Sequence, residues 1–389
     1  MANIVNERKE RNTNLELLRI ISMILIVMSH SDDWMGLATK YQNTICANKL
    51  ITDWLHMGGQ IGVGCFLLIS GYFMVDQQFS VKRILRLLGE VWFYTISIWG
   101  LYVVAKAIVG TLSFSSAFKL AINSFFPILF SHYWFVTAYV ILMILAPFFN
   151  KLINVIDKRT YQLLLAVLIT IFFIIGGGLP KVFPGMSEGR LIPVFVMYFV
   201  AGYIKKHVNN NINNSKKHLW IAVLGYIFLY ATFIGIEMIG SILDSETIMG
   251  YCYFWRPLNS PIVLIINVEL FLAFLRMKVR QSNKINAIAS NTFGVYLIHC
   301  NAIIAGSVLP RIFPVYKETN SFKILLYSIG TVIVVYMSCT IIDIIRQKTF
   351  EKIWVKILNE KYNVCEDRVK HLIDKIGKRI VLLGKWYYR

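Results

Sequence analysis

The sequence predicts an all-α, polytopic membrane protein with about ten transmembrane helices and both termini in the cytoplasm. Its mean hydropathy is +0.59, and 57% of its 389 residues are hydrophobic while 16% are charged. An average soluble domain carries about 25% charged residues. The net charge of +19 would suggest nucleic acid as the partner of a soluble protein, but here it indicates cations that hold loops on the cytoplasmic side. We therefore expect contact with membrane lipids and none with nucleic acid.

Apolar segments long enough to cross about 30 Å of hydrocarbon recur along the chain. Each is predicted to form one membrane helix, although several are short or contain Gly and Pro. The ten segments lie near 15–31, 57–75, 84–109, 134–153, 161–178, 190–204, 218–241, 258–275, 288–309 and 324–345.

The distribution of basic residues sets the expected orientation. With the N-terminus inside, the cytoplasmic connections hold clusters of cations: Arg8, Lys9 and Arg11; Lys82, Arg83 and Arg86; Lys151, Lys158 and Arg159; Lys205, Lys206, Lys216 and Lys217; and Arg276, Lys278, Arg280 and Lys284. The opposite side has mostly isolated cations. This bias, together with the even number of segments, predicts that both termini are cytoplasmic.

A basic tail follows the last predicted span. Between residues 346 and 389 apolar residues alternate with Lys and Arg, which is typical of amphipathic helices lying on an anionic inner leaflet. The segment is too short for a further catalytic domain. We therefore expect a ten-helix membrane domain over 1–345 and a basic amphipathic cytoplasmic tail over 346–389.

Two ionisable residues in the first apolar segment, Arg19 and His30, are the leading candidates for a functional site. Charged and titratable groups inside a membrane helix are costly and mark function by default. On a helix, a spacing of eleven residues is three turns plus about 20° and roughly 16 Å along the axis. Arg19 and His30 are therefore predicted to share one face, with Glu16, three residues before Arg19, forming its ion pair.

The imidazole of His30 is suited to take a proton from a hydroxyl near neutral pH. The other interpretation is a hydrogen-bonded packing histidine. Asp32 and Asp33 follow directly and could orient the ring, but we expect them to be solvated loop residues.

A second basic pair, Arg83 and Arg86, opens the third predicted span on the cytoplasmic side, where Arg19 is also expected. Residues three apart share a helix face, and two guanidinium groups can grip phosphate oxygens together. The simpler interpretation is a positive-inside anchor. The pair nevertheless predicts a phosphate-binding site.

No metal site is predicted. The membrane or outer half contains four histidines without HxxxH or HxH spacing, and the six cysteines show no CxxC spacing. These histidines are His30, His56, His132 and His299.

Two further patterns have simpler interpretations beside functional ones. The glycines of residues 58–64 are predicted to allow close helix packing, as small residues at four-residue spacing do in membranes. The aromatic trio at 133–135 is typical of an interfacial belt, and stacking against a sugar is the alternative.

These motifs, in this order, resemble the membrane acyltransferase-3 family. Arg19 and His30 fit its R-x10-H motif, and Arg83 and Arg86 fit its R-x-x-R motif. The similarity spans about residues 12–345 and leaves the tail outside. Its other signposts are NLELLR at 14–19, GVGCFLLISGY at 62–72, YWF at 133–135, YFVAGY at 198–203 and NTFGVYLIH at 291–299.

The resemblance implies transfer of an acyl group, usually acetyl, from cytoplasmic acetyl-CoA to a hydroxyl of an envelope carbohydrate such as capsule or exopolysaccharide, in a bacterial plasma membrane. In that scheme His30 is the general base or itself carries the acyl group, and Arg19 positions the donor. Arg83 and Arg86 bind the phosphates of coenzyme A, while Tyr133, Trp134 and His299 are expected to contact the substrate. A polysaccharide or lipid exporter and a non-catalytic membrane subunit are the alternatives, and homo-oligomerisation stays open.

Overall fold

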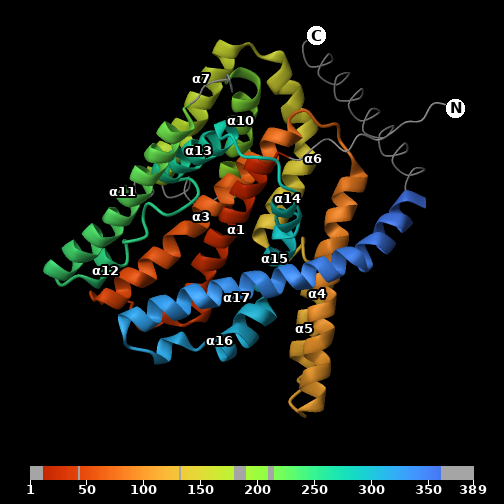
Figure 1. The fold of residues 1–389 in the computed structure, drawn as a ribbon, viewed down its shortest axis with the longest axis vertical. Coiled ribbons are helices and arrows are strands. Elements are labelled where there is room, and N and C mark those ends of the chain that lie inside the picture. Colours follow the sequence, from red (N-terminus) through yellow and green to blue (C-terminus); the bar gives the residue numbers. More distant parts are fainter. Residues whose placement is uncertain (1–11, 43, 131–132, 179–189, 209–213, 361–389) are drawn as a thin grey trace, which may run out of the picture.

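The regular structure is entirely helical in the part of the chain that the structure describes (Figure 1). The computed structural model describes residues 12–42, 44–130, 133–178, 190–208 and 214–360. The predicted all-α class is therefore confirmed.

The centre of the molecule is a helix pair, α1 (Thr13–Trp34) and α3 (Ala47–Met74), joined through the short α2 (Leu37–Lys40). Asn12 caps α1 by accepting from the backbone amides at the start of the helix. On α3, a Cβ at Gly59 would lie 2.5 Å from the Ser29 hydroxyl, and one at Gly62 would lie 2.4 Å from the Ser22 carbonyl oxygen. The glycines thus let α3 approach α1 closely, as predicted.

Other helices surround this pair. Helices α10 and α13 pack against α3, α6 packs against α10, and α11 packs against α13 (Figure 1). Their bounds are α6 (Trp134–Val155), α7 (Lys158–Ile169), η1 (Thr170–Ile175), α8 (Gly176–Gly178), α10 (Leu191–His207), α11 (Ser215–Ile242), α12 (Glu246–Met249) and α13 (Pro261–Arg276).

The remaining helices include two long ones, α17 and α4. Helix α17 crosses α1, α3 and α15, and α4 forms a hairpin with α5 (Figure 1). These elements are α4 (Val81–Ile108), α5 (Phe114–Phe125), α14 (Asn283–Ala289), α15 (Thr292–His299), η2 (Ile304–Val308), α16 (Leu309–Ile312), η3 (Val315–Lys317) and α17 (Ser321–Lys348).

Seven helices in the described part are long and apolar enough to span a membrane, and an eighth span results if the bent pair Asn283–His299 and Ile304–Ile312 is one segment. The other two predicted spans are α10 and α13, which are helical but have 17 and 16 residues. At 1.5 Å per residue they reach about 25 Å, less than the hydrocarbon thickness of about 30 Å. The protein is thus an integral membrane protein with seven or eight candidate spans. Ten spans with cytoplasmic termini remain a prediction.

The start of the predicted tail is helical and contacts α4. Helix α17 continues past residue 345 to Lys348, and residues 350–360 are also helical. The indole nitrogen of Trp354 donates to the carbonyl oxygen of Leu85 at 3.1 Å, which fixes this segment to the first turns of α4. Residues 361–389 of the tail lie outside the described residues.

Cysteine labelling checks the predicted orientation. In a background with Cys46 and Cys365 changed to serine, Glu246→Cys should react with an impermeant maleimide in intact cells. Arg280→Cys should react only after permeabilisation. Both side chains are exposed, so accessibility of the residue itself does not limit labelling. Reaction of Arg280→Cys in intact cells would overturn the cytoplasmic assignment of the α13–α14 connection.

Candidate functional site

Helix α1 carries both leading candidates on one unbroken element. It runs from Thr13 to Trp34, so the eleven-residue spacing of Arg19 and His30 is preserved and separates them by roughly 16 Å along the axis. A nitrogen of Arg19 lies 3.7 Å from a carboxylate oxygen of Glu16. This confirms the predicted ion pair, which lowers the cost of placing a cation in the helix.

His30 is held by a second histidine, His299, at the end of α15. The Nδ1 of His299 lies 2.6 Å from the carbonyl oxygen of Val295. A carbonyl only accepts, so this Nδ1 carries the proton and Nε2 is an acceptor in the neutral ring. The Nδ1 of His30 lies 3.1 Å from that Nε2, the distance of a hydrogen bond in which Nδ1–H of His30 donates and the lone pair of His30 is at Nε2. The thiol of Cys300 lies 3.2 Å from both nitrogens and is a second donor there. Nε2 of His30 has no hydrogen-bond partner among the described residues.

A helix break places His299 at this position. The segments before and after residues 300–303 are bent by 62°, and a broken helix at membrane depth is tolerated only where its freed backbone groups find partners. The Tyr133 hydroxyl donates to the carbonyl oxygen of Leu297 at 2.7 Å, and the side-chain amide of Asn301 donates to the Tyr133 oxygen at 3.0 Å. Tyr133 is 2% exposed, so its interpretation as an interfacial-belt residue is wrong. It braces the break.

The histidine pair faces a cavity of about 510 Å³. Trp134 lines the same cavity, and the guanidinium of Arg190 lies 5.2 Å from the centre of its ring. An aromatic wall with a few polar groups is typical of sites for small organic ligands. His30, Tyr133, Trp134 and His299, predicted separately from sequence, thus all line one cavity.

One expectation about the end of α1 is wrong. Asp32 is a helical residue with no exposed surface rather than a solvated loop residue. Its carboxylate lies 3.5 Å from Nδ1 of His56, because α3 packs tightly along α1. Asp33 is exposed and lines the cavity next to His30.

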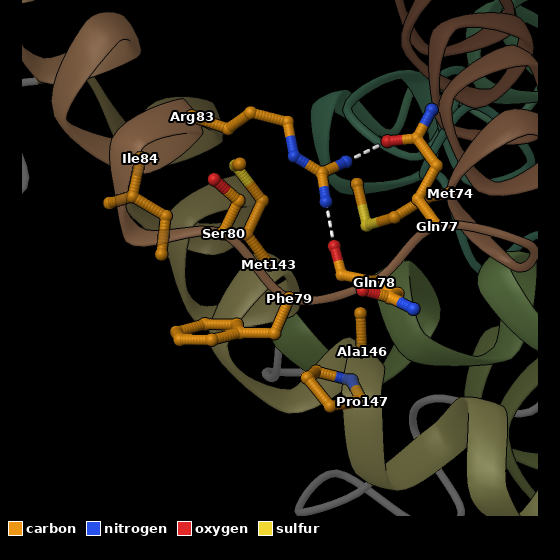
Figure 2. Close-up of a pocket in the computed structure, with 10 residues that line it drawn as sticks. All are labelled: Met74, Gln77, Gln78, Phe79, Ser80, Arg83, Ile84, Met143, Ala146 and Pro147. Atoms are coloured by element: carbon orange, nitrogen blue, oxygen red, sulfur yellow. Dashed lines mark hydrogen bonds between the residues drawn. The ribbon is translucent and has the colours of Figure 1, made fainter. Parts of the chain in front are cut away.

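At the predicted cytoplasmic end, Arg83 lies in a small recess between α4 and α6 (Figure 2). Its guanidinium donates to the side-chain oxygen of Gln77 and to the backbone carbonyl of Gln78 (Figure 2). Both partners are neutral, so no carboxylate among the described residues forms an ion pair with Arg83. A cation with neutral partners retains its attraction for an anion.

Arg86 turns to a different partner. It pairs with Glu351 in the helical segment after α17, and its side chain is 61% exposed. Glu351 also lies 3.2 Å from a nitrogen of Arg346, which pairs in turn with Glu90 at 3.1 Å and Asp343 at 2.6 Å. The two arginines of the R-x-x-R motif therefore do not converge on one point in this structure.

The site contains groups that could ligate a metal. His30, His299 and Cys300 offer ligand atoms within 4.8 Å of one another, a grouping that sequence spacing could not reveal. The Cys300 sulfur lies 3.2 Å from Nδ1 of His30 and from Nε2 of His299. Hydrogen bonds account for these distances, so the grouping has an explanation without an ion, and the sequence prediction of no metal stays a prediction.

Comparison with known proteins identifies the family of the chain. Residues 12–343 match the family profile described as an acyltransferase domain, acyltransferase-3. The chain belongs to the acyltransferase-3 family. Its acyltransferase activity follows from that membership. No curated protein and no solved structure matches the chain.

Within this acyltransferase, sequence reasoning named the residues of the cavity but missed how they pair. His299 was predicted to contact substrate, and it lines the cavity while its ring also contacts His30. Cys300 received no role, and Asp32 was expected to be a solvated loop residue. The available signal was the run that ends at His299, a histidine in an otherwise apolar segment, although nothing in the sequence indicated which distant residue it meets.

Proposed function

We propose that the protein is an O-acyltransferase that moves an acyl group, in the simplest case acetyl, from cytoplasmic acetyl-CoA to a hydroxyl of an envelope carbohydrate on the outer side of a bacterial plasma membrane. One observation carries the proposal. His30 pairs through Nδ1 with His299 and has its Nε2 without a partner among the described residues, beside a cavity large enough for a sugar unit. A positioned imidazole of this kind is suited to general-base catalysis.

In this scheme Nε2 of His30 takes the proton of the acceptor hydroxyl as its oxygen attacks the thioester carbonyl. The carbon–sulfur bond breaks, the acyl group is left on the acceptor oxygen, and the coenzyme A thiolate recovers the proton from the imidazolium. His299 keeps Nδ1–H of His30 occupied throughout, so the ring presents the same nitrogen in each cycle. Acyl transfer from a thioester to a hydroxyl is energetically downhill, so no nucleotide hydrolysis is required.

Arg83 is the better of the two candidates for holding the donor. Its present partners are neutral amide groups that a phosphate would replace with a charge-assisted bond. Arg86 already has a carboxylate partner, and binding through Arg86 would require breaking that pair. Arg19, which lies on the His30 helix, would position the donor between them.

Mass spectrometry of surface glycans tests the function. Cells with the protein should show a gain of one acyl mass per glycan repeat over cells without it. Purified protein with isotopically labelled acetyl-CoA should transfer the same label to isolated glycan. Identical glycan masses in the two strains would reject the carbohydrate as acceptor.

Substitutions in the R-x-x-R motif should separate donor binding from packing. Arg83→Ala should raise the dissociation constant for coenzyme A about ten- to hundredfold, since a hydrogen bond to a charged group is worth roughly 1.5–3 kcal/mol. Arg83→Lys should retain only part of the affinity for coenzyme A, because lysine lacks the planar pair of donors. Arg86→Ala should have a smaller effect on binding and should loosen the 350–360 helix. Calorimetric titration of the detergent-purified protein measures the affinities.

Lys82→Ala is the matched control, because it removes a cation from the same first turn of α4. It should bind coenzyme A like the unsubstituted protein. Wild-type affinity in a folded Arg83→Ala variant would return this arginine to the role of a membrane anchor.

A further inference from the structure

A second cavity, of about 320 Å³, adjoins the His30 cavity. It lies between the ends of α1 and α3, the end of α11, and the segment that joins α11 to α13. Asp33 lines both cavities, and it stands three residues after His30, on the same side of α1. A molecule bound at His30 could therefore extend past Asp33 into this second space. Its polar lining includes Gln42, Lys49, His56, Glu237 and Tyr253.

The lining contains a buried cluster of charges centred on Lys49. The ammonium group lies 2.5 Å from a carboxylate oxygen of Asp53, 2.9 Å from Glu237 and 2.8 Å from the hydroxyl of Tyr253. Lys49 and Glu237 are 4% and 3% exposed. Burying charges is costly even when they are paired, and well-packed apolar residues often serve stability equally well. The cluster is therefore poorly explained by packing alone.

A neighbouring set of buried polar groups makes few hydrogen bonds with described residues, and two of them, Asp32 and Nδ1 of His56, lie 3.5 Å apart. Both carboxylate oxygens of Asp32, one oxygen of Asp53 and Nδ1 of His56 have no hydrogen-bond partner there. Asp32 and Asp53 have no exposed surface. Arg256 contacts Nε2 of His56 and lies 5.6 Å from the ring centre of Tyr253. Of these groups His56 and Tyr253 line the cavity, and Asp32, Asp53 and Arg256 contact its lining residues.

We propose that this cavity is a second acceptor subsite that holds a hydroxyl-rich, non-acidic sugar unit next to the unit acylated at His30. The inference rests on the proposed carbohydrate acceptor. It adds that the protein binds at least two neighbouring sugar units of this acceptor and that the second unit is not acidic. A sugar unit offers both donors and acceptors around its ring and can satisfy mixed groups of this kind. An acyl chain would offer no hydrogen bonds to the polar side chains that line the cavity and would exclude water from them, at a desolvation cost.

The charges around the cavity decide against an acidic sugar. Carboxylates outnumber the cations, so a uronate would face net repulsion in a partly desolvated space. A neutral or amino sugar would not. The carboxylates of Asp33 and Glu237 line the cavity with one cation, Lys49. Asp53, Asp32 and Arg256 lie one contact away, Asp53 against Lys49 and the other two against His56.

Saturation-transfer NMR on the full-length protein in nanodiscs tests this subsite without acyl-CoA. The probes are methyl glycosides of three disaccharides: chitobiose, its de-acetylated amino form, and cellobiouronic acid. We expect the neutral and amino probes to bind, and the acidic probe to bind at least about tenfold more weakly at low salt. Equal binding of the acidic probe, or no saturable binding of any probe, would overturn the proposal.

Variants locate the effect in this cavity. Asp33→Asn and Glu237→Gln should each reduce the difference in affinity between the neutral and acidic probes. Glu237→Gln leaves Asp53 paired with Lys49, so the fold should persist. Glu246→Gln, which removes an exposed carboxylate in nearby α12, is the matched control and should leave this difference unchanged. If both cavity variants fold and the difference in affinity between the neutral and acidic probes is unchanged, the proposed subsite is wrong.

A filling variant tests the position of the second sugar unit independently of charge. Thr39 is exposed and lines the cavity, so a tryptophan at this position should fill it. In Thr39→Trp the chitobiose probe should therefore bind no more tightly than the monosaccharide methyl N-acetylglucosaminide. Tighter binding of chitobiose that survives would place the second unit elsewhere. These binding measurements do not depend on glycan acylation in cells. If only the subsite proposal is wrong, glycan acylation persists while the probes show no preference. If only the proposed reaction is wrong, the probes still bind selectively but glycan acylation does not depend on the protein.

Discussion

His30→Ala should abolish acyl transfer while leaving the protein inserted and folded. The imidazole is the only titratable ring that lines the His30 cavity with an unused ring nitrogen among the described residues. General-base catalysis typically contributes 10²–10⁴-fold to a rate, so we expect transfer to fall by about that factor. The measurement is glycan acylation in cells matched for the amount of membrane protein, followed by turnover of labelled acetyl-CoA with purified protein.

His207→Ala is a suitable control, because this histidine ends α10 and does not line the cavity. It should retain transfer, whereas His30→Ala should lose it at equal abundance and equal thermal stability. Acylation above about a tenth of wild type in His30→Ala would remove His30 from the mechanism, since even modest general-base catalysis exceeds that factor. A His30→Ala protein that no longer inserts would favour the packing interpretation of this residue.

Local features of the fold followed from the sequence because helix geometry fixes them. Arg19, Glu16 and His30 lie on one helix, so their spacing and the Glu16–Arg19 pair could be worked out from 3.6 residues per turn. The glycines at 59 and 62 likewise predicted that another helix packs closely against this one. Which helix would be that neighbour could not be read from the pattern.

Long-range contacts could not be predicted because hydropathy alone does not specify which helices meet. The contact of His30 with His299 joins residues 269 positions apart. The burial of Asp32 depends on His56 arriving from α3, and the separation of Arg83 from Arg86 depends on Glu351 arriving from the far end of the chain. Each of these is set by tertiary packing.

His299 should control the rate through the tautomer of His30. His299→Leu removes the acceptor for Nδ1–H of His30, so the proton can occupy Nε2 and the ring can turn away from the acceptor hydroxyl. We expect kcat to fall by about 10- to 100-fold, a fraction of the full general-base contribution, with KM nearly unchanged. His299→Gln should recover part of the loss, because its side-chain oxygen can accept from the same N–H. Steady-state kinetics of the purified variants separates kcat from KM.

Two comparisons distinguish this role from its competitors. If His299 only fills space, the Leu and Gln variants should behave alike and lose folded protein rather than turnover per folded molecule. If His30, His299 and Cys300 held a metal, Cys300→Ala should cost about as much activity as His299→Leu, and a strong chelator should inhibit the unsubstituted protein. The hydrogen-bond pair predicts a much smaller loss for Cys300→Ala, because the contact from Nδ1 of His30 to Nε2 of His299 and the bond to Val295 do not depend on the thiol. If Cys300→Ala and His299→Leu lose equal activity and added zinc restores it, the three residues form a metal centre and the proposed tautomer role of His299 is wrong.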